Sequence, residues 1–189
     1  MDDQNVSMTE LARRLTAEMG EAAVLTDEPM CRHTTFEIGG PADVLVMPGD
    51  AAQVVRALSV CRELDVPVMV VGRGSDLLVG DKGIRGAVVL LAENYANVLV
   101  DGRYLHAQAG ALLADVARVA AEQGLAGMEP LSGIPGSVGG ACFMNAGAYG
   151  GETAAVLESV RVLSDDGTVR RLTTAELDMG YRTSRIAKE

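Results

Sequence analysis

The sequence has 189 residues, of which 48% are hydrophobic and 22% charged, so it is long enough to bury a core in one domain or two small ones. A formal net charge of −10 argues against nucleic acid or an anionic membrane surface as the main partner. Three cysteines without a CxxC pair favour neither disulfides nor a metal site and indicate a reduced compartment. With no basic-then-apolar leader and no apolar run of membrane-spanning length, we expect a soluble cytoplasmic protein.

The first 30 residues are acidic. They hold seven acids against two arginines, which is typical of a solvated helix. Apolar residues recur at helical intervals over 8–19, with Ser7 and Glu10 at capping-box spacing, so we expect a helix there. Gly20 is the expected stop, and a short coil to Met30 should follow.

The next part of the chain reads as a small βαββ unit over 42–91. We expect strands at 42–48, 66–72 and 86–91, and a helix within 49–65 that is capped by Asp50 with Gln53 three positions on. The run at 66–72 is continuously apolar, which predicts a strand buried on both faces.

The second half favours antiparallel hairpins. Asp101-Gly102 signals one hairpin within 97–110, and Asp165-Asp166-Gly167 signals another within 156–173. A helix is expected over 111–124 with Gly124 as its stop, and a last helical turn over 173–178 with Thr173 and Glu176 at capping-box spacing. The fold class predicted is α+β, with a boundary near residue 95 between a βαββ lobe and an antiparallel-sheet lobe with helices.

Two glycine-rich segments stand out. In "VVGRGSDLLVGDKG" a predicted strand enters a Gly-x-Gly turn, where consecutive N–H groups can bind an anion because no Cβ blocks its approach. A plain strand-to-strand turn is the alternative. A dinucleotide-binding fingerprint is excluded, since Leu77 stands where its third glycine belongs and strand rather than helix follows.

The second segment, "PLSGIPGSVGGACFMNAGAYGGE" at 130–152, holds seven of the 22 glycines. Its apolar residues predict that it is buried and ordered rather than a linker. Its backbone polar groups then need partners, which a pyrophosphate-containing ligand would supply. Close packing of two backbones explains the glycines equally well.

Four motifs in register carry a family resemblance: "HTTFEIGGPADVLVMP", "VVGRGSDLLVGDKG", "LSGIPGSVGGACFMNAGAYGGE" and "GYRTS". From about Cys31 to Ser184 the chain resembles the UDP-N-acetylenolpyruvoylglucosamine reductases, FAD enzymes that complete UDP-N-acetylmuramate for peptidoglycan. The resemblance implies a two-lobed FAD-binding domain of the vanillyl-alcohol-oxidase (PCMH) type, with FAD between the lobes. With the boundaries taken from the residue patterns, we expect an acidic helix and linker at 1–30, FAD-binding lobe 1 at 31–95 and FAD-binding lobe 2 at 96–189.

The resemblance further implies which residues bind FAD. In lobe 1 they are Gly72, Arg73, Gly74, Ser75, Asp76 and Leu77. In lobe 2 they are Ser132, Gly133, Ile134, Pro135, Gly136, Ser137, Gly139, Gly140, Asn145 and Gly147. Asp76 departs from the family, which often has Asn there, and the departure places a carboxylate near the expected pyrophosphate.

The resemblance assigns catalysis to Arg182 in "GYRTS", whose permanent charge suits an enolpyruvyl carboxylate; NADPH and the UDP-sugar are the implied partners. Tyr181 is expected to be a packing residue. Glu129 and Glu152, beside the glycine segment, are candidates for a general acid or for hydrogen-bond partners of its turns. His33 and His106, far apart in sequence, suggest no metal pair.

In the family a substrate domain with the proton donor and a catalytic glutamate follows "GYRTS", whereas this sequence ends at Glu189. We therefore expect a chain that holds FAD but does not turn over alone. Two alternatives stay open: another flavin oxidoreductase of the same fold, and a non-catalytic module that uses the glycine cleft for protein contacts.

Overall fold

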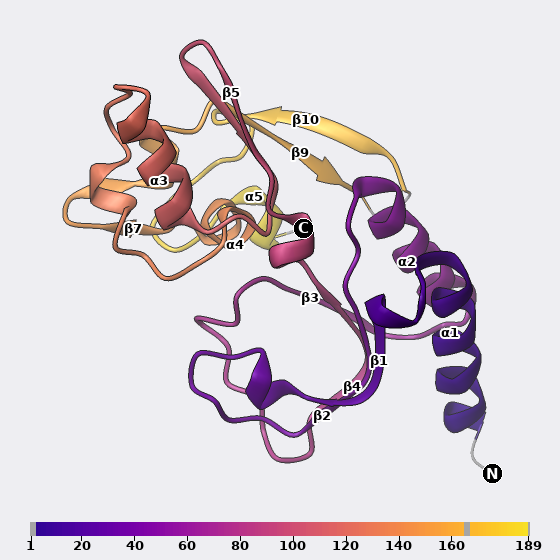
Figure 1. The fold of residues 1–189 in the computed structure, drawn as a ribbon. Coiled ribbons are helices and arrows are strands. Elements are labelled where there is room, and N and C mark those ends of the chain that lie inside the picture. Colours follow the sequence, from indigo (N-terminus) through magenta and orange to yellow (C-terminus); the bar gives the residue numbers. More distant parts are fainter. Residues whose placement is uncertain (1–2, 165–166, 189) are drawn as a thin grey trace. The chain divides into compact units, whose positions relative to one another are not determined.

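The structure, a computed structural model, describes residues 3–164 and 167–188 (Figure 1). These residues form two compact units that divide between Tyr95 and Ala96. We call them unit 1 and unit 2, and each is described by itself.

Unit 1 is built on a four-stranded sheet in the order β1-β2-β4-β3. The β1–β2 pair is antiparallel, while β2–β4 and β3–β4 are parallel. The elements are α1 (Asp3–Met19), β1 (Val24–Pro29), β2 (Pro41–Val46), α2 (Ala51–Glu63), β3 (Val68–Val71) and β4 (Ile84–Leu90), with 3-10 turns at Glu21–Ala23, Met30–Arg32 and Glu93–Tyr95.

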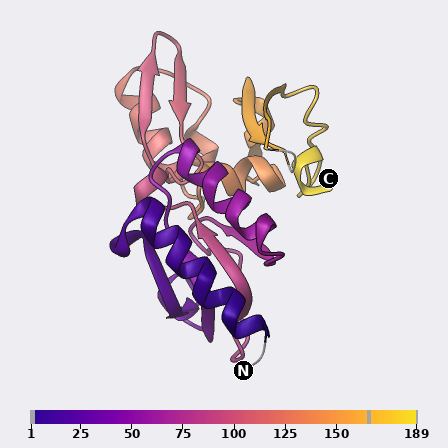
Figure 2. The ribbon, with the colours of Figure 1, turned by 90° about the vertical axis from the view of Figure 1, so that its right-hand side faces the viewer.

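The two central strands separate two apolar clusters. Val44 and Val46 of β2 face a cluster with Leu11 and Leu15 of α1, which α2 completes. Leu45, between them, faces a second cluster with residues from β3, β4 and the following loops. Helices α1 and α2 pack on each other and on one side of the sheet (Figure 2).

Three expectations for unit 1 need correction. The expected coil before Met30 contains β1, whose polar residues pair with β2 at the sheet edge. Helix α1 begins at Asp3, so Ser7 lies inside it rather than at its start. The apolar strand β3 is also an edge strand, and Val70 is 56% exposed. Asp50 does cap α2, accepting a 2.8 Å hydrogen bond from the Gln53 N–H.

Unit 2 contains three antiparallel ribbons and three helices. The elements are β5 (Val98–Asp101), β6 (Tyr104–Ala107), α3 (Leu113–Glu122), α4 (Val138–Met144), β7 (Gly147–Ala148), β8 (Gly151–Glu152), β9 (Ser159–Leu163), β10 (Val169–Thr173) and α5 (Arg185–Lys188), with 3-10 turns at Glu129–Leu131 and Thr153–Ala155. The ribbons β5–β6, β7–β8 and β9–β10 do not join into one sheet in the described residues. Mixed helices and antiparallel pairs confirm the α+β class.

The core of unit 2 is formed by α3, α4 and the glycine segment. Leu113, Leu131, Ala141 and Ala146 are buried together, with Ile134 and three other partly buried side chains against them. The expected hairpins at 97–110 and 156–173 are found, although Asp165 and Asp166 lie outside the described residues. Gly124 ends the α3 region at φ +68°.

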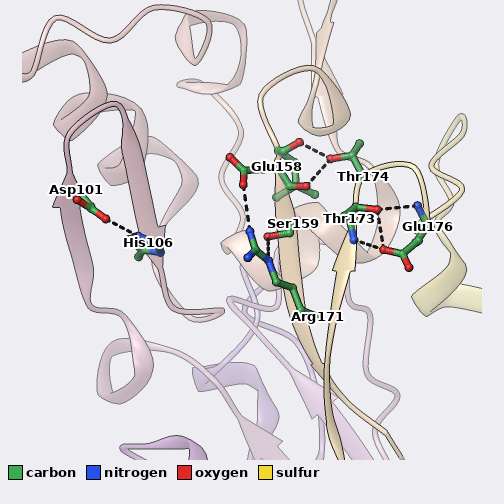
Figure 3. Close-up of polar contacts among 9 residues, drawn as sticks. Asp101, His106, Glu158, Ser159, Arg171, Thr173, Thr174 and Glu176 are labelled. Atoms are coloured by element: carbon green, nitrogen blue, oxygen red, sulfur yellow. Dashed lines mark hydrogen bonds and ion pairs between the residues drawn. The ribbon is translucent and has the colours of Figure 1, made fainter.

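The last predicted helical turn is a single α-turn with the expected bonds. Thr173 donates its N–H and its hydroxyl to Glu176 Oε2, and the Glu176 N–H reaches Thr173 Oγ1 at 3.4 Å (Figure 3). The Leu177 N–H donates to the Thr173 carbonyl at 3.0 Å. The capping box therefore forms without a longer helix.

In the described parts of the chain, no helix has the length and apolar character needed to cross a membrane. The same residues hold no cluster of three metal-ligating side chains. Burial raises the pKa of Cys61 and of Cys142 to about 11, so both thiols are protonated near neutral pH. Cys31 is only partly buried.

Candidate functional site

In unit 1, the turn at 72–77 follows β3 and depends on one glycine. Gly74 is buried and has φ +60°. A Cβ at this position would lie 2.1 Å from the His33 carbonyl oxygen. The Gly74 carbonyl also accepts the Thr35 N–H at 3.2 Å. The backbone of 33–35 therefore lies against the turn so closely that only glycine fits.

The turn exposes a row of backbone donors. Among the described residues, no protein atom accepts a hydrogen bond from the N–H groups of residues 73–76. Arg73 Nε is buried and likewise has no protein partner. Successive free N–H groups in a tight turn are the arrangement that binds anions such as phosphate.

The charges around this turn are mostly paired. The Arg73 guanidinium forms an ion pair with Glu93, and His33 Nε2 lies 3.0 Å from Glu28 Oε1. The Glu93 backbone N–H, followed by the nearby Arg73, lowers the pKa of the Glu93 carboxyl. The Asp76 side chain is exposed, so its charge lies in water. Leu77 packs on the second apolar cluster.

In unit 2, part of the glycine segment pairs with the chain before α3. The N–H groups of Val138 and Gly139 donate to the carbonyls of Ala111 and Ala109, and the Gly136 carbonyl accepts from Leu113. A Cβ at Gly139 would lie 2.9 Å from that of Ala109. Close backbone packing therefore explains Gly139.

Other glycines of the segment are not constrained by packing. A Cβ at Gly133 or Gly140 would make only ordinary contacts, at 3.8 and 3.5 Å, and both residues are exposed. Ser132 and Pro135 are exposed beside them, whereas Ile134 packs on the core. Ser137 is buried and caps α4 by accepting from the Gly140 N–H at 3.4 Å. Close packing therefore explains Gly139, while ligand binding stays a prediction for the open glycines Gly133 and Gly140.

Asn145 ends α4 and joins three stretches of the chain. It is 3% exposed and has left-handed dihedrals, which Asn tolerates better than most residues. Its Nδ2 donates to Glu152 Oε2 and to the Gly180 carbonyl, each at 3.1 Å. Its Oδ1 accepts from the Ala154 N–H at 3.0 Å.

Arg182 lies in a two-residue turn closed by reciprocal bonds. The Gly180 N–H donates to the Thr183 carbonyl at 3.0 Å, and the Thr183 N–H donates back at 3.3 Å. Arg182 has φ +53°, a strained value for a residue with a Cβ. Its Nη2 donates to the Gly147 carbonyl at 3.3 Å, and its Cζ lies 5.8 Å from the Tyr181 ring centroid.

These groups line an open groove of about 560 Å³ within unit 2. Its walls include Gly147, Tyr149, Glu152, Tyr181 and Arg182. Tyr149 and Tyr181 are 90% and 91% exposed, so the expectation that Tyr181 is a packing residue is wrong. An exposed guanidinium beside an aromatic ring can bind a planar carboxylate.

Sequence reasoning missed Tyr149. Its signal was an aromatic residue placed between glycines at 147 and 150, and it has φ +50°. Both acidic candidates hold turns: Glu152 accepts from Asn145, and Glu129 accepts from the Gly127 N–H at 2.7 Å. His106 is exposed and lies near Asp101 (Figure 3).

Comparison with known proteins gives a consistent picture. Residues 42–173 match a family described as an FAD binding domain. A UDP-N-acetylenolpyruvoylglucosamine reductase of Clostridium perfringens is 47% identical over 169 residues, covering 89% of this chain and 55% of the relative. One of Alkaliphilus metalliredigens is 43% identical over 189 residues, covering 100% and 60%. The chain therefore spans little more than half the length of the curated relatives it matches.

Solved structures agree. The UDP-N-acetylenolpyruvylglucosamine reductase of Thermus caldophilus has a TM-score of 0.71 and 37% identity, over 85% of this chain and 55% of that one. The 4-ethylphenol oxidase of Gulosibacter chungangensis has a TM-score of 0.69 at 17% identity, over 87% and 34%, which is a likeness of fold alone.

Proposed function

The chain belongs to the FAD binding domain family, and from that premise we propose that it holds FAD as the flavin-binding part of a UDP-N-acetylenolpyruvoylglucosamine reductase. The proposed reaction is the reduction of UDP-N-acetylglucosamine enolpyruvate to UDP-N-acetylmuramate with NADPH, a step that supplies peptidoglycan precursors. A cytoplasmic location is part of the same proposal.

The observation that carries the FAD proposal is the 72–77 turn. Its unbonded N–H groups at 73–76 and the buried, unpartnered Nε of Arg73 are donors in need of acceptors. The diphosphate of FAD is rich in acceptor oxygens and carries negative charge. The residues present therefore fit the cofactor.

In unit 2 we propose that the open glycines contribute to the same function. Gly133 and Gly140 leave space that a ligand can occupy, next to Ser132 and Pro135. Two other residues assigned by the resemblance fix this backbone in place: Ile134 packs on the core of unit 2, and Ser137 is buried. Asn145 and Gly147 lie further along the same segment and line the groove.

For the substrate, we propose that Arg182 binds the enolpyruvyl carboxylate. A guanidinium holds a carboxylate with two parallel hydrogen bonds and stabilises negative charge that develops during reduction. The flavin, when bound, supplies the hydride-transfer chemistry between nicotinamide and substrate. The protein residues orient the substrate and balance its charge.

A titration of the purified chain with FAD tests the proposal, followed by flavin fluorescence and by the visible spectrum after desalting. Arg73→Met removes the buried Nε donor together with the charge and should weaken binding about tenfold, or roughly 1.4 kcal/mol. Arg118→Met is the matched control, because Arg118 is also ion-paired but lies on α3 far from the turn in sequence. A folded chain that takes up no FAD contradicts the proposal.

NADPH and the UDP-sugar are tested on the loaded chain. Anaerobic bleaching of the flavin by NADPH, compared with NADH, measures the nicotinamide preference. Reoxidation by the enolpyruvyl UDP-sugar, with mass spectrometry of the product, identifies the acceptor. Since we expect the chain not to turn over alone, reoxidation by a different acceptor, rather than a lack of reoxidation by this one, favours another flavin oxidoreductase of the same fold.

A further inference from the structure

The turn that carries Arg182 is attached to the end of α4 on both sides. On one side the Gly180 carbonyl accepts the 3.1 Å bond from Asn145 Nδ2. On the other, the hydroxyl of Ser184, which is fully buried, donates to the Phe143 carbonyl at 2.6 Å. Phe143 of α4 and the C-cap residue Asn145 thus hold the two ends of a turn that lies 35 or more positions later in the chain.

The Asn145 amide is fully occupied by these links. Both hydrogens of Nδ2 are engaged, one by Gly180 and one by Glu152, and Oδ1 accepts from Ala154. Since the side chain is 3% exposed, it has neither a free hydrogen nor a free surface for a flavin. The hydrogen-bonding groups of its side chain are therefore engaged by other protein groups.

We propose that Asn145 is a positioning residue: through the Gly180 carbonyl it fixes the turn that presents Arg182 to the groove. The turn needs such a link because Arg182 is held at φ +53°, which a loosely attached segment would relax. The contact of Arg182 with the Gly147 carbonyl adds a second tie, close to Asn145 in the same segment. The importance of this positioning for reduction rests on the proposed function, whereas the link itself does not.

The first test needs neither FAD nor substrate. Amide hydrogen exchange reports the closing bonds of the turn, at the N–H groups of Gly180 and Thr183. Asn145→Asp keeps the shape and the tolerance of left-handed backbone but has no donor when ionised. We expect protection at these two amides to fall about tenfold, with β9 and β10 unchanged.

Acidification provides a rescue that a general packing defect would not show. The introduced carboxyl faces Glu152, whose negative charge should raise the pKa of the new carboxyl, and Arg182, bonded to the Gly147 carbonyl, is the cation on the linked turn. Once protonated, it regains one O–H donor for the Gly180 carbonyl. Protection factors at Gly180 and Thr183 should therefore recover as the pH falls.

A second variant separates the link from backbone strain. Asn145→Gly removes the side chain where left-handed dihedrals cost glycine nothing. Its control is Asp65→Gly, because Asp65 also has positive φ just after a helix, α2, but is exposed. Asn145→Gly should lower amide protection in the 180–183 turn, and Asp65→Gly should not. Protection within twofold of the parent in both Asn145 variants overturns the proposal.

The functional arm uses the FAD-loaded chain. If the loaded chain reacts with the enolpyruvyl UDP-sugar, Asn145→Asp should slow its reoxidation about tenfold at saturating FAD. In an Arg182→Gln background the same change should add no further loss, because the group that it positions is absent. Additive losses overturn the positioning role. A parent chain unreactive with this substrate is the result expected of a chain that does not turn over alone, and the exchange data then decide on the link.

Discussion

The two glycine-rich stretches look alike in sequence and do opposite things with their backbones. In the 72–77 turn of unit 1, glycine permits a positive φ and a close approach, and the N–H groups of 73–76 have no protein acceptor. In the 136–139 part of unit 2, glycine permits backbone pairing, and the N–H groups of Val138 and Gly139 are bonded to Ala111 and Ala109. Glycine content therefore indicates close approach, whereas the hydrogen bonds decide whether a neighbour or a ligand approaches.

The largest expected effect is at the turn itself. Gly74→Ala places a Cβ 2.1 Å from the His33 carbonyl oxygen at φ +60°, so the turn must move. We expect a loss of about 3 kcal/mol or more in unfolding free energy, from strain and overpacking together, and loss of FAD binding. Denaturant unfolding and FAD titration measure the two effects.

Gly102→Ala is the control for Gly74→Ala. It has nearly the same φ, +58°, in the β5–β6 turn, but no atom lies within 4 Å of its Cβ. It should lose only about 1–2 kcal/mol and keep FAD. Equal losses at both positions would mean that the contact with His33 is unimportant.

Gly139→Ala should have the next largest effect, on stability. The new methyl meets the Ala109 Cβ at 2.9 Å and its carbonyl oxygen at 3.1 Å, so the paired backbones must separate. We expect a loss of about 1–3 kcal/mol, which is about 2–9 °C in Tm for a chain of this size. Gly140→Ala, one residue on with only an ordinary contact, should be close to neutral. If Gly140→Ala is the more destabilising, the packing explanation fails.

Gly133→Ala should separate binding from stability. Its Cβ would lie 3.8 Å from Tyr149, an ordinary contact, so unfolding free energy should change by less than about 0.5 kcal/mol. If the open glycines border the cofactor, FAD affinity should nevertheless fall about threefold to tenfold, which is roughly 0.7–1.4 kcal/mol. Unchanged affinity would restrict the FAD contacts to residues other than Gly133.

The smallest effect concerns pH. The Glu93 carboxyl has a lowered pKa in the folded chain, caused first by its own backbone N–H and then by Arg73. It therefore adds stability above its ordinary pKa, and that contribution disappears as the pH falls through the lowered value. Because the side chain is 74% exposed, Glu93→Gln should cost less than about 1 kcal/mol at pH 7 and less still at pH 3. Thermal melts at both values measure it, and an equal cost at pH 3 would exclude the charge as the cause.

Local signals in the sequence predicted local structure well. The Asp50 cap, the stop at Gly124 and the capping box of Thr173 each depend on residues within a few positions, and each is present. The strand β1 was missed because its sequence, VLTDEP, is polar and ends in proline, and only its pairing with β2 makes it a strand. The run at 68–71 was given the wrong environment because hydrophobicity does not reveal an edge position.

For the candidate site, the resemblance selected segments and the structure separated their roles. Arg73, Gly74 and Gly139 were predicted as one class of residue, but one is a buried donor, one permits a turn and one permits packing. The link from Asn145 to Gly180 spans 35 residues, so no local pattern predicts it. The sequence also could not predict the free N–H groups of residues 73–76, because whether the described residues offer them an acceptor depends on the fold around the turn.

The left-handed backbone of Arg182 has a consequence for how this chain would respond to selection. Glycine at 182 would relieve the strain and could gain about 1 kcal/mol, while removing the guanidinium. A library selected only for heat resistance should therefore enrich glycine at 182, whereas selection for the proposed carboxylate binding should reject it. Stability and chemistry would draw this one position toward different amino acids.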